Sequence, residues 1–299
     1  ADDVAINEVN FPDPVFRKYV SDTFDTNGNR YLSKDEIAAV TKIEVYNKDI
    51  YDLTGVEYFT DIELLNCAND KVTRLDVSRN TKLKELALPN NQLTSLDISK
   101  NTELIKLNCY NNKLTALDLS NNTKLEELYC GSNRLTELDV SKNTELTRLD
   151  CYTNKLTALD VSNNAKLKIL NFDNNQIAEL DVSKNTALTW LECSENLLAS
   201  LNLSQNTALT ILGCNDNRLT SLDLSNNTAL RSTYLAGNSF DIGEVTKTYD
   251  LANLPAGFDS SKASNWQGAV CENGVLTGFT ANTITYTYNC GNGISETFT

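Results

Sequence analysis

Hydrophobic residues recur along this chain with a fixed period of 21 residues. A representative unit has apolar side chains at Leu104, Leu107, Cys109, Leu114 and Leu117, with polar residues between them. The position of Cys109 recurs in successive units as Cys67, Leu88, Cys109, Cys130, Cys151, Phe172, Cys193, Cys214 and Leu235. A period of this length indicates a solenoid, because one unit cannot bury its apolar edge alone and must stack on its neighbours.

The second half of each unit repeats the spacing of the first. The phrase from Leu114 to Asn122 matches the phrase from Leu104 to Asn112. Neither half has the 3.6-residue periodicity of an amphipathic helix. We therefore expect short strands or extended turns on both sides of a thin coil, with neighbouring coils about 4.8 Å apart.

An asparagine closes the first half of each unit. It recurs as Asn91, Asn112, Asn133, Asn154, Asn175, Asn196, Asn217 and Asn238, with Asp70 in the first unit. A carboxamide both donates and accepts hydrogen bonds, so asparagines in register can satisfy the backbone of successive tight turns. The pattern LxxLxLxxN resembles the bacterial leucine-rich repeat family over roughly residues 43–238, and residues 43–62 resemble a divergent first repeat of the internalin type. The resemblance implies that each LxL segment is a parallel strand on one face of a curved stack.

An aspartate row follows the second half of the units. Its members are Asp76, Asp97, Asp118, Asp139, Asp160, Asp181 and Asp223, with Asn202 interrupting. Like charges at the spacing of the coils repel, so a compensating interaction is expected. We favour hydrogen bonding of each carboxylate to its own turn, and a row of bound calcium ions is the alternative.

Six of the eight cysteines occupy the inward ladder, where each replaces leucine as a small hydrophobe. Side chains in register on neighbouring coils lie about 4.8 Å apart, farther than the separation of about 3.8 Å between Cβ atoms that a disulfide requires. We expect these six to be buried thiols. Cys271 and Cys290 lie outside the array, and the sequence leaves their pairing open.

Charge and composition disfavour several classes of function. The net charge is −14, and most of the acidic excess lies in the segments that flank the repeats. Nucleic acids and anionic membranes are therefore poor partners. The chain has no histidine, which removes the commonest general base and metal ligand. No apolar run approaches the 18 residues of a membrane span. We predict a protein that is not an enzyme, has no cofactor apart from possible calcium, and does not insert into a membrane.

The start of the chain suggests export. Ala1, Asp2 and Asp3 are not a signal peptide, and methionine is absent from the whole chain. We expect an extracellular protein, secreted or on the cell surface, whose signal peptide has been removed. The end at Thr299 looks like a strand cut short, so the native protein is expected to continue.

Residues 1–42 are predicted to form a helix–loop–helix N-terminal cap, with a helix from about Phe11 to Thr23. The next segment resembles the 12-residue calcium loop of EF-hand and dockerin-type modules. That resemblance implies ligands at Asp25, Asn27, Asn29, Tyr31 (through its carbonyl), Ser33 and Glu36. Arg30 replaces the usual glycine, so calcium binding is expected to be weak, and a metal-free cap with hydrogen-bonded turns is the alternative.

The remaining chain is assigned to the repeat solenoid, residues 43–239, and to a β-rich C-terminal cap, residues 240–299. Period is lost near Phe240, and Thr283–Tyr288 alternates as a strand with Thr285 and Thr287 on one face. The expected fold class is thus a β-rich solenoid of leucine-rich repeats, with little helix in the repeats, between a small helical cap and a β-rich cap that is cut short.

Variation at outward positions of the first strands indicates where a ligand binds, because the scaffold does not dictate these residues. Tyrosines on neighbouring coils lie beside Asn108, Asp150 and Arg148, and Ile169, Trp190 and Ile211 form an exposed apolar strip. Tyrosine, tryptophan and arginine are the usual anchors of interfaces, whereas cross-strand stabilisation of the sheet is the alternative. The candidate ligand-binding face comprises Tyr110, Tyr129, Arg148, Asp150, Tyr152, Asp173, Trp190, Glu192 and Ile211.

These features favour a non-catalytic binding or adhesion module that recognises a protein or a glycan at the cell surface. The resemblance implies surface adhesion or host interaction, although a fold alone does not define a function. The alternatives are a structural spacer and an accessory domain of a larger surface protein or enzyme.

Overall fold

The computed structural model describes residues 3–299, so the predicted polar start is described only from Asp3 onward. The chain divides into two compact units, Ala1–Lys155 and Leu156–Thr299. Among the described residues, no helix is long and apolar enough to cross a membrane.

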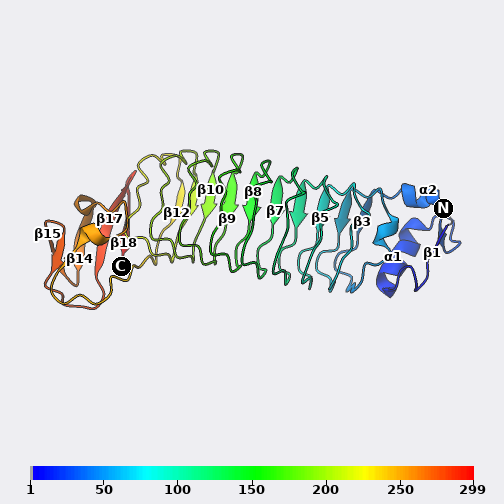
Figure 1. Ribbon diagram of the computed structural model, residues 1–299, viewed down its shortest axis with the longest axis horizontal. Coiled ribbons are helices and arrows are strands. Elements are labelled where there is room, and N and C mark those ends of the chain that lie inside the picture. The colour runs from blue at the N-terminus through cyan, green and yellow to red at the C-terminus, as the bar shows by residue number, and fades with distance from the viewer. Residues whose placement is uncertain (1–2) are drawn as a thin grey trace. The chain divides into compact units, whose positions relative to one another are not determined.

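The first unit begins with the N-terminal cap (Figure 1). Its elements are β1 (Val4–Ala5), α1 (Pro14–Phe24), β2 (Tyr31–Leu32) and α2 (Lys34–Ala38), and β1 pairs antiparallel with β2. Helix α1 begins three residues later than the sequence suggests, because Asp13 accepts hydrogen bonds from the N–H groups of Val15 and Phe16 as an N-cap. A capping box between Ser33 and Glu36 starts α2. Phe16, Val20 and Leu32 are fully buried in the core of this cap.

Six parallel strands follow in the first unit, each three residues long and each paired in register with the next. They are β3 (Lys42–Glu44), β4 (Leu64–Asn66), β5 (Glu85–Ala87), β6 (Lys106–Asn108), β7 (Glu127–Tyr129) and β8 (Arg148–Asp150), with a 3-10 helix at Val56–Tyr58. The central leucine of each strand from β4 to β8 is buried, and its neighbours point outward. The predicted solenoid of leucine-rich repeats is confirmed (Figure 1).

The second unit continues the same repeat and then changes to antiparallel sheets. Its parallel strands are β9 (Ile169–Asn171), β10 (Trp190–Glu192), β11 (Ile211–Gly213) and β12 (Ser232–Tyr234). The C-terminal elements are β13 (Tyr249–Asp250), β14 (Ala263–Gln267), β15 (Val270–Glu272), β16 (Val275–Thr277), β17 (Thr285–Gly291) and β18 (Ile294–Phe298), with 3-10 helices at Leu251–Asn253 and Ser260–Lys262. The sheets have the orders β13-β16-β15 and β14-β17-β18. The β-rich C-terminal cap is thus present, and Thr285 and Thr287 share the outer face of β17 while Tyr286 and Tyr288 are buried.

Strands occupy only the first half of each repeat. The second half consists of turns and extended backbone, as where the N–H of Asn122 donates to the carbonyl oxygen of Leu119 at 3.0 Å. Of the two expected structures, short strands or extended turns, the second half of each repeat forms extended turns. The aspartate row hydrogen-bonds its own turns, as predicted: an oxygen of Asp118 accepts from the N–H of Ser120 at 2.9 Å, and the hydrogen bonds from Ser120 lower the pKa of Asp118.

The asparagine ladder fixes the register of the coils. The Nδ2 of Asn112 donates to the carbonyl oxygens of Leu88 at 3.0 Å and of Cys109 at 3.1 Å. Its Oδ1 accepts from the N–H of Leu93 at 3.0 Å. One buried carboxamide therefore joins its own turn to the preceding coil, as the sequence suggested.

The ladder cysteines are buried. Burial raises the pKa of the Cys109 thiol to about 12, which makes it inert as a nucleophile at neutral pH. The pKa values of Cys67 and Cys214 are also raised by burial. Cys271 and Cys290 lie in different sheets and are not joined to each other.

Candidate binding surface

The outward side chains of β7 and β8 form the centre of the first candidate surface. We define the tyrosine cluster as Tyr110, Tyr129, Arg148, Asp150 and Tyr152, all of which belong to the first unit. Because the strands pair in register, Tyr129 lies directly opposite Asp150, and Glu127 opposite Arg148. Strand pairing alone therefore brings together the residues that lie far apart in the sequence.

Arg148 is held by partners within the chain. Its Nε donates to Oδ2 of Asp150 at 2.8 Å, and its Nη2 forms an ion pair with the same oxygen at 2.8 Å. Its guanidinium carbon lies 4.9 Å from the centre of the Tyr129 ring. The hydroxyl of Tyr129 donates to Glu127 at 2.7 Å. Lys106 approaches the same ring at 5.7 Å. An arginine stacked on a tyrosine and fixed by a carboxylate has little conformational freedom left to lose when a ligand binds.

Tyr110 and Tyr152 meet over a glycine. The two occupy equivalent positions two coils apart, and Gly131 occupies that position on the coil between them. Their ring centres lie 5.7 Å apart at an interplanar angle of 39°. A Cβ atom on Gly131 would lie 2.9 Å from the Tyr152 ring, so the missing side chain is what admits this ring. The sequence signal was available, since a glycine stands between two tyrosines at one repeat position.

The ionisation of the tyrosine cluster follows from its burial. Burial raises the pKa of Tyr129 to about 12, with a further contribution from its hydrogen bond to Glu127. Burial and then a hydrogen bond with Tyr110 raise the pKa of Tyr152 to about 12. Burial also raises the pKa of Asp150, whereas Arg148 lowers it. Tyr129 and Tyr152 are therefore neutral at physiological pH and offer hydroxyl groups and apolar ring faces.

The second candidate surface lies in the second unit. We define the tryptophan patch as Trp190, Glu192, Ile211 and Tyr234. Trp190 pairs with Ile169 on one side and Ile211 on the other, so the three residues form the predicted apolar row. Of the three, Trp190 is exposed, whereas Ile169 and Ile211 are half-buried. The indole N–H of Trp190 donates to Glu192 at 2.8 Å, and the Trp190 side chain remains 38% exposed.

The tryptophan patch also contains a residue that the sequence analysis missed. Tyr234 is 55% exposed and pairs with Gly213 on the neighbouring strand. The Glu192 carboxylate covers Gly213 from the other side, since a Cβ atom there would overlap a Glu192 oxygen. Tyr234 could have been found by following the outward positions one unit farther.

Asp173 has a different role from its neighbours. One of its oxygens accepts from the N–H of Ser194 on the next coil at 2.6 Å. Burial raises the pKa of Asp173 to about 7, although the Ser194 hydrogen bond opposes the shift. This carboxyl group is half-buried and supports the turns beside β9 and β10.

In the turn that follows each repeat strand, one residue has a positive, left-handed φ angle. The residue type at this position changes near the two candidate surfaces. In the first unit this position is Asn69, Asn90 and Asn111, then Ser132 and Thr153 with φ of 52°. In the second unit it is Asn174, then Glu195 and Asp216, then Gly237. Asparagine and glycine adopt this conformation most readily, and a β-branched threonine is strained there. Thr153 directly follows Tyr152, so strain is retained beside the tyrosine cluster.

The residues of the N-terminal loop hydrogen-bond one another. The carboxylate of Asp25 accepts from the N–H groups of Gly28, Asn29 and Arg30. Glu36 accepts from the backbone and hydroxyl groups of Thr26 and Ser33, and these hydrogen bonds lower its pKa to about 2.

The loop oxygens are thus already engaged. Asn27 and Asn29 also accept from backbone N–H groups, Tyr31 is exposed, and Arg30 has a left-handed φ of 66°. Within residues 3–299 no group of three or more acidic, histidine or cysteine side chains is placed to hold a metal ion. Calcium binding by this loop stays a prediction.

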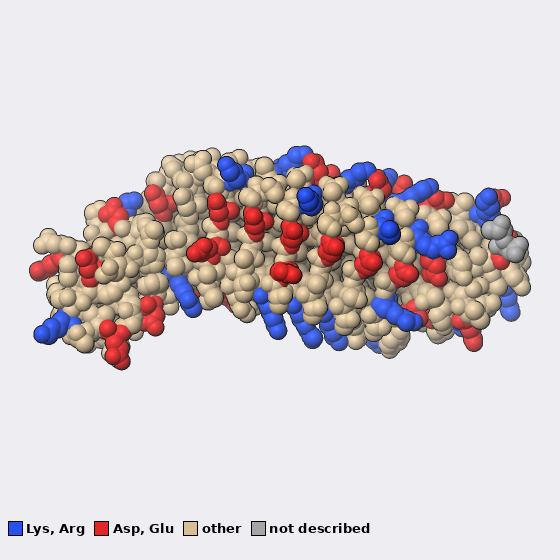
Figure 2. Space-filling model, viewed as in Figure 1, with Lys and Arg blue, Asp and Glu red and all other residues tan. Residues whose placement is uncertain are grey.

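Charge on the two units is predominantly acidic. Figure 2 shows acidic side chains following one another along the displayed face of the repeats. Arg148, the basic residue of the tyrosine cluster, is already paired with Asp150, and the adjacent Lys106 is paired with Glu127 at 3.7 Å.

Comparisons with known proteins agree with the repeat geometry. A profile of the family described as leucine-rich repeats (two copies) matches residues 102–143. Internalin J of Listeria monocytogenes serotype 4b (strain F2365) is 42% identical over 71 residues, which are 24% of this chain and 8% of that protein. This chain therefore spans a small part of the curated relative that it matches.

Two solved structures are similar to the fold. One is described as the functional domain of internalin J from Listeria monocytogenes, which includes a cysteine ladder. Its TM-score is 0.63 at 26% sequence identity, and the match covers 100% of this chain and 98% of the internalin J domain. The other is a leucine-rich repeat protein of Leptospira interrogans, with a TM-score of 0.65 and 25% identity, covering 69% of this chain and 58% of that one.

The fold and its surfaces define a solenoid protein built from leucine-rich repeats. The repeat profile, the similarity to internalin J and the shared architecture support a leucine-rich repeat protein that is similar to the internalins.

Proposed function

We propose that this chain is a non-catalytic recognition module that binds a protein partner outside the cell through the outward face of its strands. The tyrosine cluster carries the proposal. It combines three tyrosines and an arginine, the residue types that dominate binding energy at interfaces, on a rigid parallel sheet.

The arrangement of the tyrosine cluster favours protein binding over simple stabilisation of the sheet. Tyr110 and Tyr152 are only half-buried, and their contact depends on a glycine that adds nothing to the sheet. Arg148 already has its carboxylate and its aromatic partner. The side chains are thus preorganised, which lowers the entropic cost of binding.

The tryptophan patch supports the same function in the second unit. The Trp190 indole is 38% exposed next to Ile211, and Glu192, which accepts from the indole N–H, forms the polar rim of this apolar surface. Such an arrangement is typical of interface anchors and is unusual for a solvated sheet.

Binding to immobilised proteins of host cell surfaces and the extracellular matrix, with mucins and glycan arrays in parallel, tests the proposal. Each surface has its own variant, Tyr152→Ala and Trp190→Ala, and Tyr46→Ala is the matched control because this tyrosine is also exposed in the repeats. We expect a protein ligand whose Kd rises about 10-fold to 30-fold in at least one of the two variants and is unchanged in the control.

Three outcomes would count against the proposal. Binding to glycans alone would replace the ligand class, and binding that neither variant weakens would move the site elsewhere. Failure of the folded chain to bind any ligand would favour a structural spacer or an accessory domain of a larger protein. The same assays are run with calcium and with EDTA. Binding that is lost only in EDTA would point to a contribution of the Asp25–Glu36 loop to ligand binding.

A further inference from the structure

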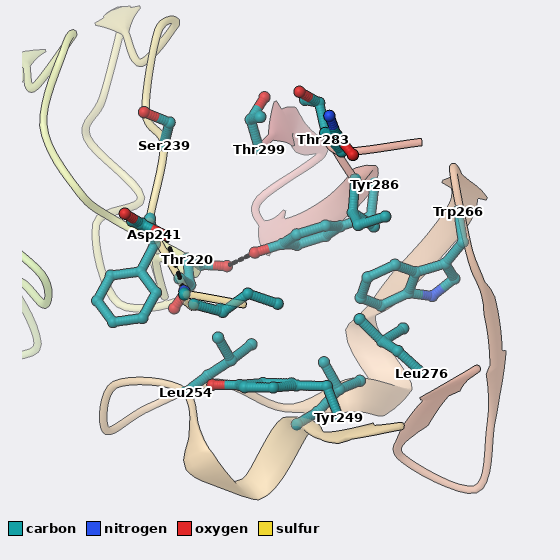
Figure 3. A pocket seen from close by; sticks show the side chains of 16 residues that line it. Thr220, Ser239, Asp241, Tyr249, Leu254, Trp266, Leu276, Thr283, Tyr286 and Thr299 are labelled. Carbon is teal, nitrogen blue, oxygen red and sulfur yellow. Dashed lines mark hydrogen bonds between the residues drawn. The ribbon is translucent and has the colours of Figure 1, made fainter. Parts of the chain in front are cut away.

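A cavity of about 340 Å³ lies in the second unit, beneath the C-terminal sheets (Figure 3). Its walls include the aromatic residues Phe240, Tyr249, Trp266 and Tyr286. Figure 3 shows Tyr249 and Tyr286 on opposite sides of the space, with Trp266 beside Tyr286 at one end. A pocket of this size is within the range of small-molecule sites.

The aromatic walls are fixed by their surroundings. Trp266 stacks on Tyr286 with ring centres 4.5 Å apart, and Phe258 and Phe298 contact Tyr286 from other directions. The hydroxyl of Tyr286 donates to the carbonyl oxygen of Thr220 at 2.6 Å. These contacts hold the Tyr286 ring in place before any ligand arrives, so the site is preformed.

The polar part of the lining suits hydroxyl groups. Hydroxyl and amide side chains contribute to the walls beside the aromatic rings, among them Ser239, Asn282 and Thr283. The hydroxyl of Thr220, in the same wall, is buried and has no hydrogen-bond partner within the described part of the chain. A purely apolar ligand would leave this hydrogen-bonding capacity unused.

Charge narrows the class of ligand further. Among the described residues that line the cavity there is no lysine or arginine, so an anion would find no counter-charge. Asp241 carries the negative charge of the lining, but it is exposed to water and already accepts from the N–H of Gly243 at 2.8 Å. A cation would therefore gain little from it, and a neutral ligand is favoured.

We propose that this aromatic cavity binds a neutral sugar ring. The apolar C–H face of a pyranose would lie against Tyr249 and Tyr286, and its hydroxyl groups would hydrogen-bond Thr220, Asn282 and Asp241. The cavity shares no residue with either candidate protein-binding surface, and the proposal does not depend on their function.

Tryptophan fluorescence gives a direct test. The chain has two tryptophans, so Trp190→Phe leaves Trp266, in the cavity wall, as the sole reporter. The probes are methyl glycosides of glucose, galactose, mannose and N-acetylglucosamine, with choline and cyclohexylmethanol as a cationic and an apolar probe. Calorimetry on the chain without substitutions checks each hit. We expect saturable binding of at least one glycoside with a Kd on the order of 1 mM.

Variants of the lining identify the site. Tyr249→Ala should weaken binding at least tenfold and Tyr249→Phe less than twofold, because the ring face is the contact. Asn282→Ala, on the exposed rim, should weaken it several-fold without affecting folding. Val270→Ala is the control, an exposed apolar residue of the same unit outside the cavity and outside both candidate surfaces. Preference for choline or cyclohexylmethanol, insensitivity to both Tyr249→Ala and Asn282→Ala, or no saturation tenfold above the expected Kd would each overturn the proposal.

Discussion

Replacing Arg148 by alanine should destabilise the protein by isolating a buried carboxylate. The side chain of Asp150 is 7% exposed, and Arg148 gives it a hydrogen bond from Nε and an ion-pair contact from Nη2, both at 2.8 Å. Burial raises the pKa of Asp150 and Arg148 lowers it, so Arg148 opposes protonation of the carboxylate. Arg148→Ala leaves that charge with its desolvation cost and without its counter-charge.

The expected magnitude follows from the charged hydrogen bond and the exposure of its donor. A hydrogen bond to a charged group contributes about 1.5–3 kcal/mol. The Nε and Nη2 contacts end on one oxygen, and the Arg148 side chain is 36% exposed, so water replaces part of the loss. We expect Arg148→Ala to cost about 2–3 kcal/mol, a large part of the total stability of about 5–15 kcal/mol typical of a protein.

A double-mutant cycle separates the charge from the loss of packing. Asp150→Asn keeps an acceptor and removes the charge, so it should cost about 1 kcal/mol or less. The double variant Arg148→Ala/Asp150→Asn should then be more stable than Arg148→Ala, with a coupling energy of at least about 1 kcal/mol. Urea unfolding at pH 7, followed by circular dichroism, measures all four proteins.

The pH dependence provides a second readout. In Arg148→Ala the folded pKa of Asp150 rises farther above its unfolded value of about 3.9. Between those two pKa values the folded state holds a proton that the unfolded state has lost, so stability falls as pH rises through that window. The double variant should not show this additional fall. If Arg148→Ala changes stability by less than about 0.5 kcal/mol, or Asp150→Asn fails to rescue it, the reasoning about an isolated buried charge is wrong.

Three further predictions concern single residues. Asp173 has a folded pKa of about 7, raised by burial, so stability should fall as pH rises from 4 to 7; this fall should be absent from Asp173→Asn in urea unfolding across that range. Thr153→Asn should stabilise the protein by about 1 kcal/mol in the same assay, since asparagine tolerates the left-handed φ of 52° better than threonine, and no gain would mean that the turn is unstrained. Arg30→Gly should raise the melting temperature, because glycine adopts the left-handed φ of 66° without strain. If the loop is a calcium site, the same substitution should strengthen calcium binding in titration calorimetry, and the control Glu36→Gln should weaken it.

Much of the scaffold could be predicted because the repeat fixes the register. Once Asn112 and Asn133 occupy the same place in successive units, their hydrogen bonds to the preceding coils follow from geometry alone. The buried leucines and cysteines follow in the same way, since a strand that pairs in register turns the same face inward in every unit.

The details of the candidate surfaces could be predicted only in part. The positions of Tyr110, Tyr129 and Tyr152 within their repeats place them on neighbouring coils, but the repeat pattern does not predict side-chain rotamers. The choice of Asp150 as the partner of Arg148 and the meeting of Tyr110 with Tyr152 depend on those rotamers. The aromatic cavity depends on the packing of antiparallel sheets with no repeat, so its walls have no periodic signal in the sequence.

The asparagine ladder has a consequence for how this protein can vary. Each carboxamide bonds backbone groups 24 and 19 residues earlier in the chain, and these separations are the same from coil to coil. Removing residues 112–132 would place Asn133 where Asn112 now stands and leave every ladder bond intact, whereas removing a few residues more or fewer would break them. A change in the length of the array that keeps this ladder must therefore be a multiple of 21 residues, and each such step adds or removes one outward strand.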